Sequence, residues 1–147
     1  MWVVKSNSGF TIIEFIATLA IVTALSAIAF FNFNDYEAPS QSGASALMGF
    51  LKQGRAKALA TTRAYTLAPY STTRVTATYG STGSSTTQTT DSLLILDLPS
   101  GAYLTDTSWS ICYGTRGLSN DSADIEVTDG GSSETVQVVL GGGVRTL

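Results

Sequence analysis

Residues 10–33, FTIIEFIATLAIVTALSAIAFFNF, decide the fold of this chain, because they are predominantly apolar and carry a single charge, at Glu14. As an α-helix, these 24 residues span about 36 Å, more than the roughly 30 Å hydrocarbon core of a bilayer. Lys5 precedes the run, whereas Asp35 and Glu37 follow it. The positive-inside rule then places the N-terminus in the cytoplasm and the chain after residue 34 outside. We therefore predict one transmembrane helix over residues 10–33.

A secretory signal peptide is the alternative interpretation of this run. Such a peptide combines a basic start, about 7–15 apolar residues and a small-x-small cleavage site. The tripeptide Ala27-Ile28-Ala29 has the form of such a site. However, the apolar run starts well before this point and continues through Phe30 and Phe31. Its length favours a helix that stays in the membrane.

The composition provides few of the side chains that commonly act in catalysis. The chain has 147 residues, 13% of them charged, and its formal net charge is −3. It contains no histidine, which excludes imidazole as a base, a metal ligand or a triad member. Its one cysteine, Cys112, excludes an intramolecular disulfide and a multi-cysteine metal site. We predict no enzymatic activity, no cofactor and no metal site. A membrane-tethered enzyme would have to use paired carboxylates, with Asp91, Asp97, Asp121 and Asp124 as candidates.

Residues 9–14, Gly-Phe-Thr-Ile-Ile-Glu, resemble the processing site of type IV prepilins and type II secretion pseudopilins. The resemblance rests on a glycine, a phenylalanine, an acid at the fifth position after the glycine, and an apolar helix that follows at once. It implies that a prepilin peptidase cleaves between Gly9 and Phe10 and methylates the new N-terminus. The mature chain would then begin with N-methylphenylalanine, and residues 1–9 would be a leader peptide.

Glu14 is the candidate assembly residue. A carboxylate one turn into a membrane helix costs free energy unless it is paired, so such residues are functional by default. The resemblance implies that Glu14 meets the N-terminal amine of a neighbouring subunit and so sets the register of a filament. The alternative is a side chain that reaches the lipid headgroups, at a helix start where the dipole tolerates an anion.

The rest of the chain predicts an α+β domain. Pro39 and Gly43 are expected to break or bend the first helix. Apolar residues at helical spacing then predict an amphipathic helix over about 45–62. Its bases Lys52, Arg55 and Lys57 would form a solvated face, with a partner site as the alternative. From residue 63 the period changes to two, which predicts an antiparallel sheet built from the runs 64–69, 74–79, 92–98, 101–105, 109–114, 123–128, 134–140 and 144–147.

We therefore expect four parts. These are a leader at 1–9, a transmembrane assembly helix at 10–33, a linker with an amphipathic helix at 34–64, and an antiparallel β domain at 65–147. Residues 71–92 are rich in serine and threonine and are expected to form an exposed loop at a hairpin tip. Cys112 is expected to be a buried thiol.

Parts of the β region resemble the GspH/FimT branch of the pilin family at the level of pattern. These parts are residues 51–67, 109–120 and the closing run 136–145. Some relatives end in a glycine-arginine-x-arginine motif that contacts DNA, and Gly142-Gly143-Val144-Arg145 keeps one of the two arginines. Arg145, Arg116 and Arg74 are the candidate DNA contacts, although the acidic balance argues against a general nucleic-acid surface.

The resemblance implies a minor type IV pilin or pseudopilin, with a DNA-binding minor pilin of a natural-transformation pilus and a type II secretion pseudopilin as alternatives. Its partners would be other pilins through the N-terminal helix, the prepilin peptidase, the inner-membrane assembly platform and membrane lipid, with DNA as a weaker candidate. The chain would wait in the bacterial inner membrane as a single-pass protein with a periplasmic C-terminal domain. It would then enter a pilus or secretion filament.

Overall fold

The computed structural model describes residues 11–33, 38–81 and 87–147, and among these it describes every side chain outside 27–33. The chain divides into two compact units, Met1–Tyr36 and Glu37–Leu147. Gly9 and Phe10, the predicted cleavage site, lie outside the described residues. The centre of the predicted serine- and threonine-rich loop, residues 82–86, also lies outside them.

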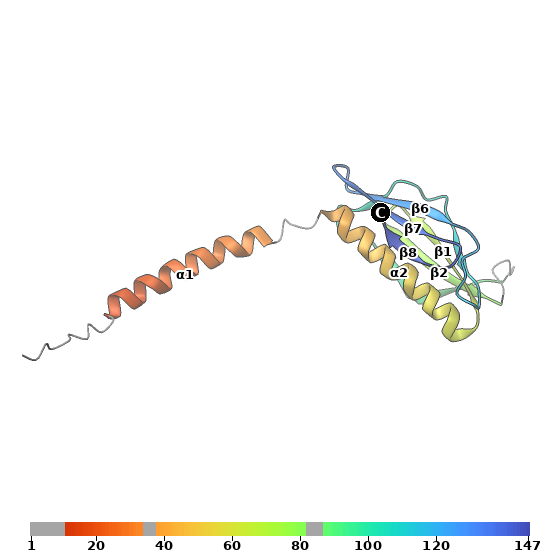
Figure 1. Cartoon of the computed structure of the whole chain (residues 1–147), viewed down its shortest axis with the longest axis horizontal. Helices are drawn as coiled ribbons and strands as arrows, with labels where there is room; N and C mark the ends of the chain where they lie inside the picture. The colour runs from red at the N-terminus through yellow and green to blue at the C-terminus, as the bar shows by residue number, and fades with distance from the viewer. Residues whose placement is uncertain (1–10, 34–37, 82–86) are drawn as a thin grey trace, which may run out of the picture. The chain divides into compact units, whose positions relative to one another are not determined.

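The first unit contains the helix α1 (Ile12–Phe33), drawn in orange in Figure 1. Its sequence favours a helix because it contains neither proline nor glycine and is rich in alanine and leucine. Hydroxyl side chains within it bond back to carbonyls of the preceding turn, as Thr23 does to Leu19 (3.0 Å) and Ser26 does to Val22 (2.7 Å). These bonds satisfy the polar groups of an otherwise apolar helix.

The second unit begins with the helix α2 (Pro39–Thr61). The expectation that Pro39 and Gly43 interrupt helical structure is wrong for Gly43, and Pro39 starts a helix instead of bending one. Proline suits the first helical position, because its missing N–H has no intrahelical partner there and its φ is already helical. Gly43 stays helical and is buried, since a Cβ at this position would lie 2.9 Å from both Ala102 Cβ and Val127 Cγ1.

The buried face of α2 follows the predicted spacing. Leu47, Leu51 and Ala58 are fully buried, and Gly54 packs directly on Leu67 of the first strand. Leu59, which we predicted on the same stripe, is 48% exposed. The helix ends at Thr61, and the next residue, Thr62, has a φ of 50°, which places it in the left-handed region and turns the chain into the first strand.

Eight strands follow among the described residues, and each overlaps one of the eight runs predicted from the period of two. They are β1 (Ala64–Ser71), β2 (Arg74–Gly80), β3 (Thr89–Asp97), β4 (Tyr103–Leu104), β5 (Ile111–Tyr113), β6 (Ala123–Thr128), β7 (Ser133–Val138) and β8 (Val144–Thr146). The strands form two antiparallel sheets of four rather than one. Sheet A has the order β3-β2-β1-β5, and sheet B has the order β4-β6-β7-β8.

Helix α2 packs against strands of both sheets, including β1 of sheet A and β6, β7 and β8 of sheet B (Figure 1). The core between them is mainly aliphatic, with Val75 from sheet A and Val127 and Val136 from sheet B all at 0% exposure, and it also contains the buried aromatic side chains of Phe50, Tyr65 and Tyr113. The α+β prediction is thus confirmed for the described residues. Leu140 is 58% exposed, contrary to the predicted buried face, because β7 ends at Val138.

Candidate functional site

The first turn of α1 holds the predicted assembly residue, Glu14, in a capping box. Glu14 Oε2 accepts hydrogen bonds from the backbone N–H and the hydroxyl of Thr11, both at 3.0 Å. In return, Thr11 Oγ1 accepts a bond from the Glu14 amide at 3.4 Å. This reciprocal arrangement satisfies donors that a helix start leaves free. Within the single chain, the carboxylate of Glu14 therefore caps the start of its own helix.

Over its described side chains, residues 12–26, α1 presents large apolar side chains that are exposed. Ile12 is 81% exposed, and Phe15 and Leu25 are 62% and 61% exposed. Bare apolar area of this extent marks a surface that meets a membrane or another chain. Membrane insertion is a prediction from the sequence, and among the described helices none is long and apolar enough to cross a bilayer.

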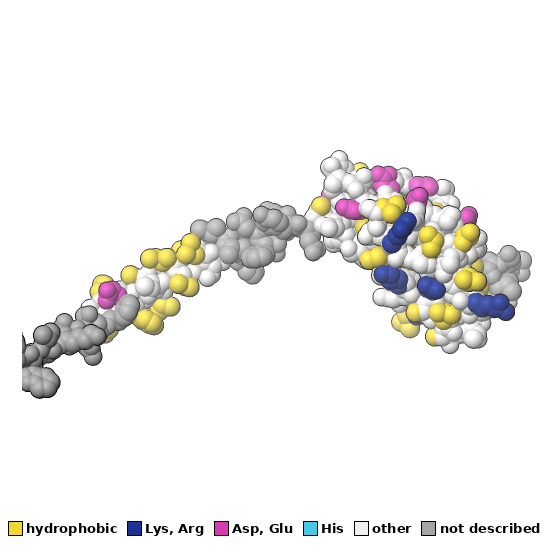
Figure 2. Space-filling view, in the orientation of Figure 1, with side chains coloured by type: hydrophobic (Ala, Val, Ile, Leu, Met, Phe, Trp, Pro, Cys, Tyr) yellow, Lys and Arg dark blue, Asp and Glu magenta, His cyan; other side chains and the backbone are white. Residues whose placement is uncertain are grey.

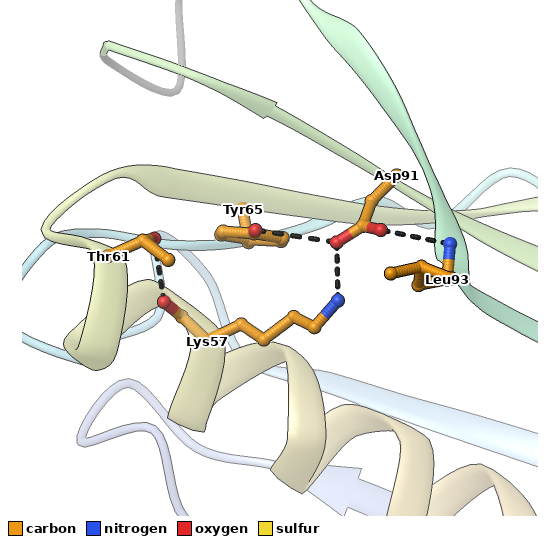
Figure 3. A network of polar contacts seen from close by, with 5 residues as sticks. All are labelled: Lys57, Thr61, Tyr65, Asp91 and Leu93. Carbon is orange, nitrogen blue, oxygen red and sulfur yellow. Dashed lines mark hydrogen bonds and ion pairs between the residues drawn. The ribbon is translucent and has the colours of Figure 1, made fainter.

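The second half of α2 is tied to sheet A by a buried polar network (Figure 3). Lys57 Nζ lies 2.6 Å from Asp91 Oδ2 at the start of β3, and the hydroxyl of Tyr65 in β1 donates to the same oxygen at 3.4 Å. The backbone amide of Leu93 donates to the other oxygen, Asp91 Oδ1, at 3.0 Å. The aspartate side chain is 11% exposed and the lysine side chain 34%.

These contacts set the charge state of Asp91. Burial raises the pKa of the carboxyl, but the hydrogen bonds from Lys57 and the Leu93 amide outweigh it, so the pKa of Asp91 lies below its ordinary value. The prediction of a solvated basic face on α2 is wrong for Lys57, because its amine forms the ion pair with Asp91. The prediction fails because sequence spacing does not show that β3 brings an acid under the helix.

The start of α2 is held by the turn between β6 and β7. Ala38 offers no side-chain cap, and the Ser40 amide lies 3.4 Å from Asp129 Oδ2 instead. The hydroxyl of the buried Ser40 bonds that of Ser132 at 2.6 Å. Hydrogen bonds from the Ser132 and Gly131 amides hold the pKa of Asp129 well below its ordinary value. An anion is thus kept at the positive end of the helix dipole.

The three arginines predicted as DNA contacts lie on different parts of the unit. Arg74 of β2 forms a bidentate pair with Asp97, with Nε 2.5 Å from Oδ1 and Nη2 3.1 Å from Oδ2. Arg145 of β8 donates from Nε and Nη2 to Gln137 Oε1, at 2.9 and 2.6 Å, on sheet B. Arg116 is exposed in the loop between β5 and β6. Whether any of them contacts DNA stays a prediction.

The carboxylates considered for catalysis are likewise separated. Asp91 and Asp97 are paired with Lys57 and Arg74, and Asp124 accepts a bond from Gln137 Nε2 at 2.9 Å. In the part of the chain that the structure describes, no three His, Cys, Asp or Glu side chains come together to hold a metal ion. Cys112 is half-buried, contrary to the predicted buried thiol, because Ile111 and Tyr113 take the core side of β5.

Two features of this site went unrecognised in the sequence. The capping box has a local signal, Thr11-Ile-Ile-Glu14, in the form Thr-x-x-Glu before an apolar run. The pair Lys57–Asp91 joins residues 34 positions apart and has no local signal. A pairing between helix and strand depends on the packing of the two elements.

The fold is similar to that of solved pilins. Two crystal structures of the type IV minor pilin FimU from Pseudomonas aeruginosa match with TM-scores of 0.56 and 0.59, at 14% and 13% sequence identity. The matches cover 73% and 80% of this chain, and 91% and 92% of the FimU chains. No family model and no curated protein matches the sequence. At this identity, the similarity establishes a pilin-like fold.

Proposed function

We propose that this chain is a minor type IV pilin, a structural subunit that enters a pilus or a related secretion filament through its N-terminal helix. The proposal rests on one observation. The same chain contains a pilin-like globular unit and an apolar helix whose large side chains are exposed. Such a helix requires a lipid or protein environment, because exposing this much apolar area to water is unfavourable. The motif at residues 9–14 is the site at which a prepilin peptidase would process the precursor.

In this proposal the precursor is cleaved after Gly9, and Phe10 becomes an N-methylated terminus. Residues 10–33 hold the subunit in the inner membrane until the assembly platform transfers it to the filament. There the helix packs against the helices of other pilins. No catalytic group is needed, because the subunit works by packing and by one charge pair.

Glu14 changes partner in this scheme. In the single chain its carboxylate accepts two bonds from Thr11. In the filament we propose that it meets the N-terminal amine of the neighbouring subunit. A charge pair in an apolar environment is far stronger than one in water, so this contact can select the correct register. The capping bonds keep the carboxylate satisfied until the partner arrives.

A matched pair of variants tests the role of Glu14. Glu14→Val removes the carboxylate, whereas Thr11→Val removes the hydroxyl that caps it and leaves the carboxylate in place. We expect Glu14→Val to remain in the membrane fraction and to be lost from sheared filaments, while Thr11→Val assembles. If both variants are lost from filaments equally, the carboxylate acts through the helix cap and the proposed charge pair is wrong. Mass spectrometry of the mature chain should show cleavage after Gly9 and one added methyl group.

A deletion strain distinguishes the machine that the subunit serves. Labelled-DNA uptake and protein secretion would be measured in parallel, together with the number of pili. Lost pili or lost uptake with intact secretion would support the type IV pilus, and lost secretion with normal uptake would support a type II pseudopilin. A gel-shift with the unit from Glu37 onward tests DNA binding, and no shift at low salt would remove Arg145, Arg116 and Arg74 as contacts. If pili, uptake and secretion were all unchanged, the filament role would be refuted.

A further inference from the structure

Two surfaces of the second unit carry opposite charges that the chain does not neutralise itself. Figure 2 shows Lys and Arg side chains over α2, whereas Asp and Glu side chains gather toward the border where β6 runs. Among the described residues, the ion pairs are Lys57–Asp91 and Arg74–Asp97. The remaining charges on these surfaces have no opposite charge within ion-pair distance.

The basic surface consists of Lys52, Arg55, Leu59, Arg116 and Leu118. It is one continuous patch, because the loop after β5 lies over the end of α2. A Cβ at Gly117 would lie 3.1 Å from the Leu59 methyl carbons, and Arg116 and Leu118 flank that glycine.

Arg55 lies beside the same loop. A Cβ at Gly142 would lie 3.0 Å from Arg55 Nε, and the Gly117 carbonyl is close to that position as well. The buried Arg55 Nε has no hydrogen-bond partner in the described chain. Exposed leucines stand among these cations, with Leu59 at 48% and Leu118 at 52% exposure. Apolar side chains mixed with cations suit a protein partner better than a nucleic-acid backbone, which offers charge without an apolar surface.

The acidic surface consists of Asp106, Asp124 and Glu126, and its β6 residues lie on the face of sheet B that points away from α2. Ile125 and Val127 of β6 are buried, and Val127 faces α2 at Gly43, so the alternating residues Asp124 and Glu126 face away from the helix. Glu126 Oε2 accepts a bond from Thr105 Oγ1 at 3.1 Å, and the exposed Asp106 follows that threonine. Arg145 of β8 borders this surface, because Gln137 donates to Asp124 and accepts hydrogen bonds from Arg145.

We propose that the basic surface of one subunit docks on the acidic surface of a second copy of this chain. The basic surface lies on and beside α2, whereas the acids of β6 face away from that helix, so a single chain does not bring them together and a second copy can present the complementary charges. Because the surfaces differ, the contact is heterologous and head-to-tail, and it extends into an open row instead of closing as a symmetric dimer. The proposal rests on the filament role, which needs an interface of this open kind.

The test uses the unit Glu37–Leu147, which has its own core, in sedimentation experiments. We expect its average mass to rise with concentration at low salt and to fall to that of a monomer near ~1 M salt, where charges are screened beyond about 3 Å. Arg116→Glu and Glu126→Lys should each weaken association at least ~10-fold, because each sets like charges against each other. Arg74→Glu makes the same reversal of charge on sheet A, where it also breaks the pair with Asp97, and the folded variant should associate as the wild type does.

A mixture of the two surface variants separates this geometry from others. Arg116→Glu retains a native acidic surface and Glu126→Lys retains a native basic surface. The two substituted surfaces also complement each other, with Glu at 116 against Lys at 126, so an equal mixture should form rows in which the two variants alternate. The chain carrying both substitutions should associate again into rows. A wild-type unit that stays monomeric at low salt would overturn the proposal, as would an inert mixture. So would DNA binding that Arg116→Glu abolishes while the unit itself stays monomeric.

The outcome is independent of the filament experiments. If the unit associates as described but the deletion strain keeps its pili and secretion, only the filament role fails. If the strain loses its filaments but the unit is monomeric, only the head-to-tail contact fails.

Discussion

Two glycines of α2 offer a direct test of how closely the helix packs on sheet B. A Cβ at Gly43 would lie 2.9 Å from Ala102 Cβ and from Val127 Cγ1, and both neighbours are buried. A Cβ at Gly49 would meet nothing within 4 Å. The two residues lie on the same helix, so Gly→Ala changes the intrinsic helical preference equally at both. Any difference between the variants therefore reports packing.

The expected free energies follow from two opposing effects. Replacing glycine by alanine inside a helix stabilises it by about 0.5–1 kcal/mol. Gly49→Ala should show this gain, which raises Tm by a few degrees. At Gly43 the added methyl group overpacks the core, at a cost of about 1–3 kcal/mol. Ala102 Cβ is attached to the backbone and cannot rotate away, so Gly43→Ala should be less stable than Gly49→Ala by about 1–3 kcal/mol.

Urea unfolding of the unit Glu37–Leu147, followed by circular dichroism, measures both variants against the wild type. The slope of free energy against urea should be unchanged, so that the midpoints report stability. Ala102→Gly in the Gly43→Ala background should recover part of the loss, because it removes one of the two clashing carbons. A Gly43→Ala variant as stable as Gly49→Ala would refute the close packing of α2 on β6.

Three further predictions concern polar groups of the same unit. Asp91→Asn should destabilise it by about 1–2 kcal/mol at neutral pH, since the ion pair with Lys57 is lost and the amine is partly exposed. The lowered pKa of Asp91 means that this stabilisation is present above about pH 4 and is lost as the pH falls through the folded-state pKa, so acid titration of the variant should be flatter. Burial raises the pKa of Tyr113 to about 12. The neutral tyrosine therefore contributes its full share to the free energy of unfolding below about pH 10, and this share is lost as the pH rises toward 12. Tyr113→Phe should keep full stability at pH 7 and lose less at alkaline pH, since the buried hydroxyl has no partner in the described chain; a large loss at pH 7 would contradict this. Asp129→Ala should lower Tm and speed hydrogen exchange of the Ser40 amide, and unchanged exchange would show that the turn does not cap α2.

Local patterns in the sequence were sufficient to locate the elements. All eight runs with a period of two contain a strand, because alternation of apolar and polar residues is a property of each run alone. The end of α2 was also predicted to within a residue or two. The start of α2 was not predicted. Proline breaks a helix in its interior but favours its first turn, and glycine weakens a helix but allows a close contact with a neighbouring element. Only the neighbours Ala102 and Val127 decide which of these applies to Gly43.

The candidate site divides in the same way. Glu14 was recognisable because a lone acid in an apolar helix is rare, and its cap, Thr11, lies three residues away. By contrast, the sequence suggested Asp91 as a catalytic candidate and Lys57 as part of a solvated face, although the two side chains form an ion pair. Their contact depends on how β3 packs beside α2, and neither residue has a neighbour in sequence that signals the other.

By itself, the sequence determined that this protein has an apolar first helix with a single acid, a second helix, and eight antiparallel strands. These are short-range properties of charge and periodicity. Only the tertiary structure decided that the strands form two sheets. The chain passes from β3 in sheet A to β4 in sheet B, returns to sheet A as β5 and leaves it again for β6. Periodicity gives each strand an apolar face but does not name its partner strand, because the pairings join distant residues such as Tyr103 with Thr128 and Tyr65 with Tyr113.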